Sequence, residues 1–81
     1  MTPQDARQAV AGALTEIVPD ADLDTIPEDA SLREELELDS LDFLTFVELL
    51  SSRTQARIDE TDYPRLATLG SSVAFISERA A

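Results

Sequence analysis

Residues 39–50 read DSLDFLTFVELL, and this stretch determines the fold class that we expect. Aspartate and serine are favoured at helix N-termini, and the apolar residues that follow them recur every three to four positions. The pattern predicts an amphipathic helix that begins at Asp39 or Ser40. Its core-facing stripe comprises Phe43, Phe46, Val47 and Leu50.

Two further leucines of this helix, Leu41 and Leu44, point away from the stripe, on a face that they share with Glu48. A helix with apolar side chains outside its core stripe has surface available for binding something else. The polar run from Ser51 to Thr54 predicts that the helix frays at its end.

The segment before this helix carries most of the charge. From Glu16 to Asp42 there are eleven acidic residues and one arginine, Arg33, so ten of the eleven net negative charges fall in one third of the chain. A structureless loop of this length is unusual in a small domain. Ser31, followed three residues later by Glu34, is a capping-box pattern and predicts one helical turn. The apolar residues expected to pin the segment to the core are Ile26, Leu32, Leu36 and Leu38.

A first helix precedes the acidic segment. Thr2 is a suitable N-cap, Pro3 suits the first helical position, and Pro19 cannot continue the helix. Apolar residues recur at helical spacing between these limits. They are Ala6, Val10, Ala13, Leu14, Ile17 and Val18.

The C-terminal part predicts an irregular segment and a last helix. Pro64 disfavours helical backbone at Tyr63, so any helix over residues 59–64 is short, and Thr68 is a suitable cap for the helix that follows. The stripe of that helix comprises Leu69, Val73, Ile76 and Ala80, with Phe75 beside it. Three longer helices, one short helix and a long loop after the first predict an all-α fold, a small antiparallel four-helix bundle, with residues 1–81 as a single domain.

The composition excludes several classes of function. The 81 residues include no histidine and no cysteine, which removes the commonest general base and all thiolate chemistry. With 17 acidic and 6 basic residues, the net charge of −11 disfavours binding to nucleic acid and to anionic membranes. No apolar stretch is long enough for a membrane span, and residues 1–5 lack the features of a signal peptide. We therefore expect a cytoplasmic monomer that does not insert into membranes.

The acidic run Asp20-Ala21-Asp22-Leu23-Asp24 suggests a calcium-binding loop but lacks two required residues. Thr25 stands where the loop needs glycine, and Ser31 stands where it needs glutamate. We expect diffuse, weak binding of divalent ions to the acidic segment and no specific metal site.

Residues 37–42, Glu-Leu-Asp-Ser-Leu-Asp, place a serine at a helix start directly after the acidic segment. One interpretation is that Ser40 or Asp39 only caps the helix. The surroundings favour another, because Asp39-Ser40-Leu41 resembles the motif of acyl carrier proteins whose serine receives 4′-phosphopantetheine. The resemblance extends over nearly the whole chain in the order of helices and loop, and residues 39–58 align with typical bacterial members without a gap.

The resemblance implies a carrier and not an enzyme. Ser40 is the implied attachment point of an arm that holds acyl groups as thioesters, in fatty-acid, polyketide or specialised lipid biosynthesis. Serine is a weak nucleophile and the chain has no histidine to activate it, so a separate phosphopantetheinyl transferase must load the arm from coenzyme A. Asp39 is implied to help hold the Mg²⁺ of the transferase complex, and Asp39 and Leu41 flank the attachment site.

The resemblance also implies two binding surfaces. The face that docks acyl-transferring, acyl-activating and synthase enzymes through their basic patches corresponds to Leu41, Asp42, Leu44 and Glu48. Phe43 and Phe46 correspond to the acyl pocket, and both are bulkier than the residues usual there. Alternatively, Phe43 only fills core space left by a small residue such as Thr54.

Two other functions stay open. Peptidyl and D-alanyl carrier proteins share the same architecture, and the strong acidity favours the acyl type over them. A non-modified acidic interaction module would have the same charge and helices but would never gain a phosphopantetheine. The gain in mass on incubation with a transferase and coenzyme A separates the carriers from this module.

The charge distribution predicts a stability that rises with salt. The ten net negative charges between Glu16 and Asp42 repel one another in the folded state, and Mg²⁺, Ca²⁺ or moderate monovalent salt weakens that repulsion. The melting temperature, measured by circular dichroism, should therefore rise from low to physiological salt. The same salt should weaken binding to basic partner enzymes. A melting temperature that stays flat or falls would contradict this explanation.

Overall fold

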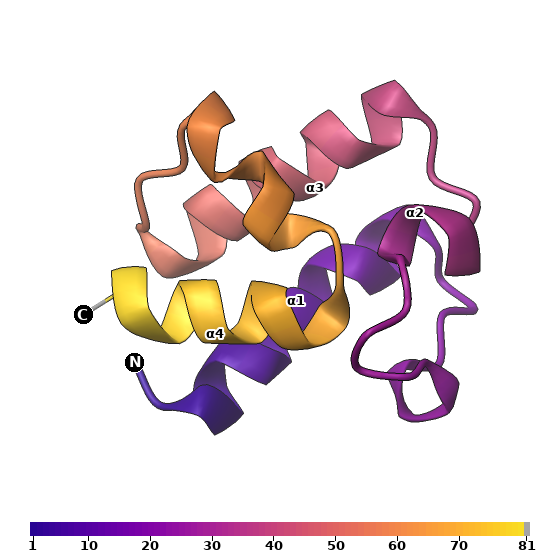
Figure 1. The fold of residues 1–81 in the computed structure, drawn as a ribbon, viewed down its shortest axis with the longest axis horizontal. Helices are drawn as coiled ribbons and strands as arrows, with labels where there is room; N and C mark the ends of the chain where they lie inside the picture. Colours follow the sequence, from indigo (N-terminus) through magenta and orange to yellow (C-terminus); the bar gives the residue numbers. More distant parts are fainter. Residues whose placement is uncertain (81) are drawn as a thin grey trace.

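Three long helices carry the fold of residues 1–80, which the computed structural model describes (Figure 1). They are α1 (Pro3–Ile17), α3 (Ser40–Thr54) and α4 (Leu69–Arg79). Three short helices connect them: the 3₁₀ helix η1 (Leu23–Thr25), the single turn α2 (Leu32–Glu35) and the 3₁₀ helix η2 (Glu60–Leu66). α1 packs against both α3 and α4 and runs in the opposite direction. The predicted all-α bundle is confirmed.

Each long helix begins where the sequence predicts, because a side chain satisfies a free N–H of its first turn. The cap accepts a hydrogen bond from the backbone N–H three residues further on. The caps are Thr2 for α1, Asp39 for α3 and Thr68 for α4, with distances of 3.1, 2.8 and 3.1 Å. α1 ends at Ile17, two residues before Pro19, as expected.

The core fills the space where α1 meets α3 and α4. Its fully buried side chains include Leu14 of α1, Phe46 and Leu50 of α3, and Ile76 of α4. The predicted stripes are confirmed at these positions, whereas Ile17, Val18 and Val73 are only half-buried. Phe75, expected beside the stripe of the last helix, is 1% exposed and belongs to the core.

The predicted fraying of α3 is wrong. The helix continues to Thr54, and the Gln55 N–H still donates to the Ser51 carbonyl at 2.8 Å. The left-handed backbone of Gln55 (φ 60°) then turns the chain out of the helix. Thr54 is buried, and its hydroxyl donates to the Leu50 carbonyl at 2.7 Å and accepts from the Ala56 N–H at 3.2 Å. Local hydrogen bonds thus satisfy the polar end of the helix.

The acidic segment is fastened to the start of α4. The Leu32 N–H donates to the Ala67 carbonyl at 2.9 Å, and the Gly70 N–H donates to the Glu28 carbonyl at 2.9 Å. A side chain at Gly70 would place its Cβ 3.2 Å from that Glu28 oxygen, so glycine allows the close approach. The Ser31 hydroxyl accepts from the Glu34 N–H at 3.3 Å, which confirms the predicted helical turn.

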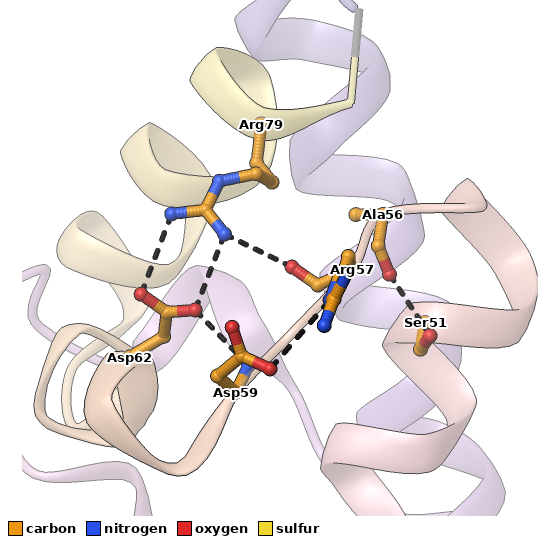
Figure 2. Close-up of polar contacts among 6 residues, drawn as sticks. All are labelled: Ser51, Ala56, Arg57, Asp59, Asp62 and Arg79. Atoms are coloured by element: carbon orange, nitrogen blue, oxygen red, sulfur yellow. Dashed lines mark hydrogen bonds and ion pairs between the residues drawn. The ribbon is translucent and has the colours of Figure 1, made fainter.

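A polar network holds η2 against α4 (Figure 2). The Arg79 guanidinium donates to both carboxylate oxygens of Asp62, at 3.2 and 3.3 Å, and to the Arg57 carbonyl at 3.0 Å. Asp62 also accepts a hydrogen bond from the Asp59 N–H at 3.0 Å. This backbone hydrogen bond, followed by the nearby Arg79 guanidinium, holds the pKa of the Asp62 carboxyl below its ordinary value.

The network predicts an acid-sensitive attachment of η2. The lowered pKa of Asp62 means that the folded state favours its carboxylate, so this stabilisation is complete above the unfolded-state pKa of about 4 and is lost as the pH falls below it. Asp62→Asn should lower the melting temperature at pH 7, and its difference from the parent should shrink toward pH 3.

Glu60→Gln is a matched control, because it removes an exposed carboxylate from the same short helix. Thermal denaturation at a series of pH values checks both variants. A constant difference between parent and Asp62→Asn over the whole pH range would contradict the assignment.

Candidate functional site

Ser40 is the first residue of α3, and its side chain is exposed. The capping of this helix is done by its neighbours. Asp39 accepts from the Asp42 N–H at 2.8 Å, and Asp42 accepts from the Asp39 N–H at 3.4 Å, forming a reciprocal capping box. The helix therefore does not need the Ser40 hydroxyl for its cap. Of the two residues that could cap this helix, the structure assigns the role to Asp39.

A cavity of about 420 Å³, open to solvent, begins at Ser40. Its walls come from the first half of α3, from the middle of η2 and the residue after that helix, and from α2, so it lies between segments far apart in the sequence. Most of the lining is apolar, as expected for a site that receives a hydrophobic ligand. The lining residues are Arg33, Ser40, Phe43, Leu44, Tyr63, Pro64 and Ala67.

Phe43 forms part of the wall between the cavity and the core. Its ring packs edge-on against Tyr63, with ring centroids 5.5 Å apart, and is tilted against the ring of Phe46, with centroids 6.3 Å apart. Phe46 is fully buried and does not line the cavity, so only Phe43 of the two expected pocket residues is there. Thr54 lies eleven residues further along α3, about 16 Å away, so Phe43 does not fill the space beside it.

The other predicted residues lie along the outer side of α3. Leu41 is 74% and Leu44 is 44% exposed, which are high values for apolar side chains, and Glu48 is also exposed. Asp42 is half-buried and takes part in the capping box. Leu44 belongs to both surfaces, since it also lines the cavity.

Four residues of the cavity were not identified from the sequence as site residues: Arg33, Tyr63, Pro64 and Ala67. In the sequence, Tyr63 and Pro64 stand out only as a helix-disrupting pair, and Arg33 only as the single basic residue of an acidic segment. The isolated positive charge of Arg33 was the one feature in the sequence that distinguished it. For the other three, only the packing of η2 beside α3 shows the role.

Residues 1–80 contain neither a metal site of acidic side chains nor a membrane-spanning helix. No group of three or more acidic side chains converges in a way that could hold a metal ion. None of the helices in this part of the chain is both long and apolar enough to cross a membrane.

Known proteins match both the sequence and the fold. The family model described as "Phosphopantetheine attachment site" matches residues 7–76. The acyl carrier protein of Kineococcus radiotolerans is 32% identical over 76 residues, which cover 90% of this chain and 94% of that protein. The chain belongs to the acyl carrier protein family. An acyl carrier protein structure from Enterococcus faecalis, 25% identical, matches with a TM-score of 0.78 over 98% of this chain and 99% of its own.

Membership of the acyl carrier protein family settles several predictions made from the sequence. The family is a group of carriers and not of enzymes, and its cofactor is 4′-phosphopantetheine. The site described above fits such a cofactor, because an exposed hydroxyl adjoins an open, mostly apolar cavity. The family also implies a phosphopantetheinyl transferase and synthase enzymes as partners in general.

Proposed function

We propose that Ser40 is the attachment point of 4′-phosphopantetheine and that the protein carries acyl groups as thioesters on this arm. The observation that carries the proposal is the position of Ser40. It is an exposed hydroxyl at the first position of α3, left free by the Asp39 cap, at the edge of an apolar cavity. A helix N-terminus also favours the negative charge that a phosphodiester brings.

The loading reaction needs a second protein. The Ser40 oxygen forms a bond to the phosphorus of coenzyme A nearest the pantetheine, the pyrophosphate bond breaks, and adenosine 3′,5′-bisphosphate leaves. The hydroxyl proton must pass to a base of the transferase, since this chain has no histidine to accept it. In this proposal Asp39, the N-cap residue beside Ser40, contributes a carboxylate oxygen to the transferase Mg²⁺.

The outer face of α3 is the proposed docking surface for the transferase and for acyl-transferring, acyl-activating and synthase enzymes. Leu41 and Leu44 supply exposed apolar surface next to Ser40, and Asp42 and Glu48 supply negative charge for basic patches on the partners. The pathway is fatty-acid, polyketide or specialised lipid biosynthesis. A monomeric state and a cytoplasmic location stay predictions from the sequence.

The attachment site can be tested by mass. Incubated with coenzyme A, Mg²⁺ and a broad-specificity phosphopantetheinyl transferase, the parent should gain the mass of one phosphopantetheine, and Ser40→Ala should gain none. Because Asp39 caps α3, Ser40→Ala should change the free energy of unfolding by no more than about 0.5 kcal/mol. Intact-mass spectrometry and circular dichroism give the two readouts.

Ser52→Ala is the matched control for attachment, since Ser52 is an exposed serine at the other end of the same helix. It should be modified as the parent is. Modification of Ser40→Ala would place the attachment elsewhere, and a parent that several transferases leave unmodified would favour the non-modified interaction module instead.

The Phe43 wall predicts poor sequestration of long acyl chains. The ring is packed between Tyr63 and the buried Phe46, and close-packed interiors do not share such volume with an alkyl chain. A long chain must stay in the open cavity or in solvent, so short, branched or aromatic acids suit the protein better. Phe43→Ala should open the wall and slow the hydrolysis of an octanoyl thioester severalfold.

Leu49→Ala is the control for a general loosening of α3, because Leu49 is half-buried on the same helix but does not line the cavity. Its octanoyl thioester should be hydrolysed as fast as that of the parent. If the parent already protects the octanoyl thioester as well as Phe43→Ala does, Phe43 does not close the path into the core.

A further inference from the structure

Arg33 differs from the other five arginines in having no ion pair within residues 1–80. The other five all pair with a carboxylate: Arg7 with Glu28, Arg53 with Glu16, Arg57 with Asp59, Arg65 with Glu78, and Arg79 with Asp62. Arg33 stays unpaired in the most acidic part of the chain.

The local backbone explains why Arg33 has no partner. On a helix, side chains three or four positions apart face each other, and the acidic residues at that spacing from Arg33 are Asp29 and Glu37. Both lie outside α2, because Asp29 precedes the N-cap Ser31 and the helix ends at Glu35. Glu37 also has left-handed backbone with φ 53°, so it does not continue the helix on which Arg33 lies. The guanidinium lies instead over the ring of Phe43, 5.7 Å from its centroid.

This position brings the guanidinium to the cavity of the attachment site. Arg33 and Ser40 both line that cavity, and Phe43, which Arg33 covers, lies one helical turn after Ser40. An exposed stacking contact with an aromatic ring is weak compared with a charge-assisted hydrogen bond to an anion. The guanidinium can therefore leave the ring for an anion in the cavity without breaking an ion pair.

An anion at Ser40 needs such a partner. A phosphodiester there adds a negative charge beside the carboxylates of Asp39 and Asp42, in a segment that already has ten net negative charges. Arg33 is the single basic residue between Glu16 and Asp42. Interactions between charges separated by more than about 8 Å are largely screened at physiological salt. Arg33, which lines the same cavity, therefore stabilises an anion at Ser40 more than the distant arginines do.

We propose that Arg33 binds the anionic oxygens that the arm brings to this cavity. These oxygens can come from two sources, the phosphodiester on Ser40 or a terminal carboxylate on a cargo that folds back into the cavity. The planar guanidinium can donate two parallel hydrogen bonds to either group. Binding of either lays the arm along the side of the cavity formed by Phe43 and Tyr63. The inference rests on the proposed attachment of the arm at Ser40 and adds a recognition residue for the arm or for acidic cargo.

The Nε–Hε resonances of the six arginines give a direct test by ¹⁵N NMR. The resonance of Arg33 is assigned by its loss in Arg33→Gln, and it is followed in the apo, holo, butyryl-loaded and succinyl-loaded proteins. A shift of the Arg33 resonance between the apo and holo forms identifies the phosphodiester as the anion. A shift that occurs only with the succinyl group, and not with the butyryl group, identifies the terminal carboxylate.

A matched pair of variants provides a second readout on the arm itself. Arg33→Gln should move the ³¹P resonance of the holo protein, or the carboxylate ¹³C resonance of the succinyl form, whichever anion the first test identifies. Arg57→Gln removes the same charge from an arginine that is 88% exposed beyond the far end of α3, and it should move neither resonance. Raising the salt concentration should shift the parent resonances toward those of Arg33→Gln.

The outcomes separate this inference from the proposed function. A parent that is not modified at Ser40 overturns both. A parent that is modified normally, with an Arg33 resonance that does not move in any of the loaded forms, overturns the role of Arg33 alone. Equal effects of Arg33→Gln and Arg57→Gln on the ³¹P and ¹³C resonances would show only the loss of one positive charge, and would also overturn it.

Discussion

The burial of Leu32 and Leu38 in the acidic segment is the constraint on which the position of the site depends. The two side chains are 1% and 5% exposed, and burying a leucine contributes about 1.5–3 kcal/mol. That contribution holds a segment with ten net negative charges against the core, although the charges favour its expansion. Since Leu38 directly precedes Asp39, its burial fixes where α3 begins, and with it the direction in which Ser40 is presented.

At the start of α3, the capping of the helix and the proposed attachment of the arm fall to different residues. Asp39 and Asp42 satisfy each other's backbone N–H groups, so the helix is capped without the Ser40 hydroxyl. A serine that also capped the helix would have to break that bond to react. Leu41 and Leu44 place exposed apolar surface on the same turns of the helix, beside Ser40. The proposed attachment point and the proposed docking surface therefore share one short stretch of helix.

The other wall of the cavity belongs to η2, which comes from a distant part of the sequence. Arg79 holds η2 to α4 through Asp62 and the Arg57 carbonyl, and Asp62 directly precedes Tyr63 in the chain. The edge-on contact between Tyr63 and Phe43 then joins η2 to α3. The width of the cavity thus depends on an exposed polar network and an aromatic pair, both weaker than the packing of the three long helices.

The sequence by itself determined the three long helices, their N-caps and the exposed serine, because each depends on residues within one turn of each other. Thr2, Asp39 and Thr68 act on the N–H three residues further on, and the apolar stripes follow the helical repeat. The sequence pattern wrongly predicted fraying at Thr54. This polar residue at the helix end is buried, and two backbone groups satisfy its hydroxyl. Only the tertiary structure decided that Arg33, Phe43 and Tyr63 meet beside Ser40. Their contacts join three separate elements, and the periodicity of one element does not encode its distance from another.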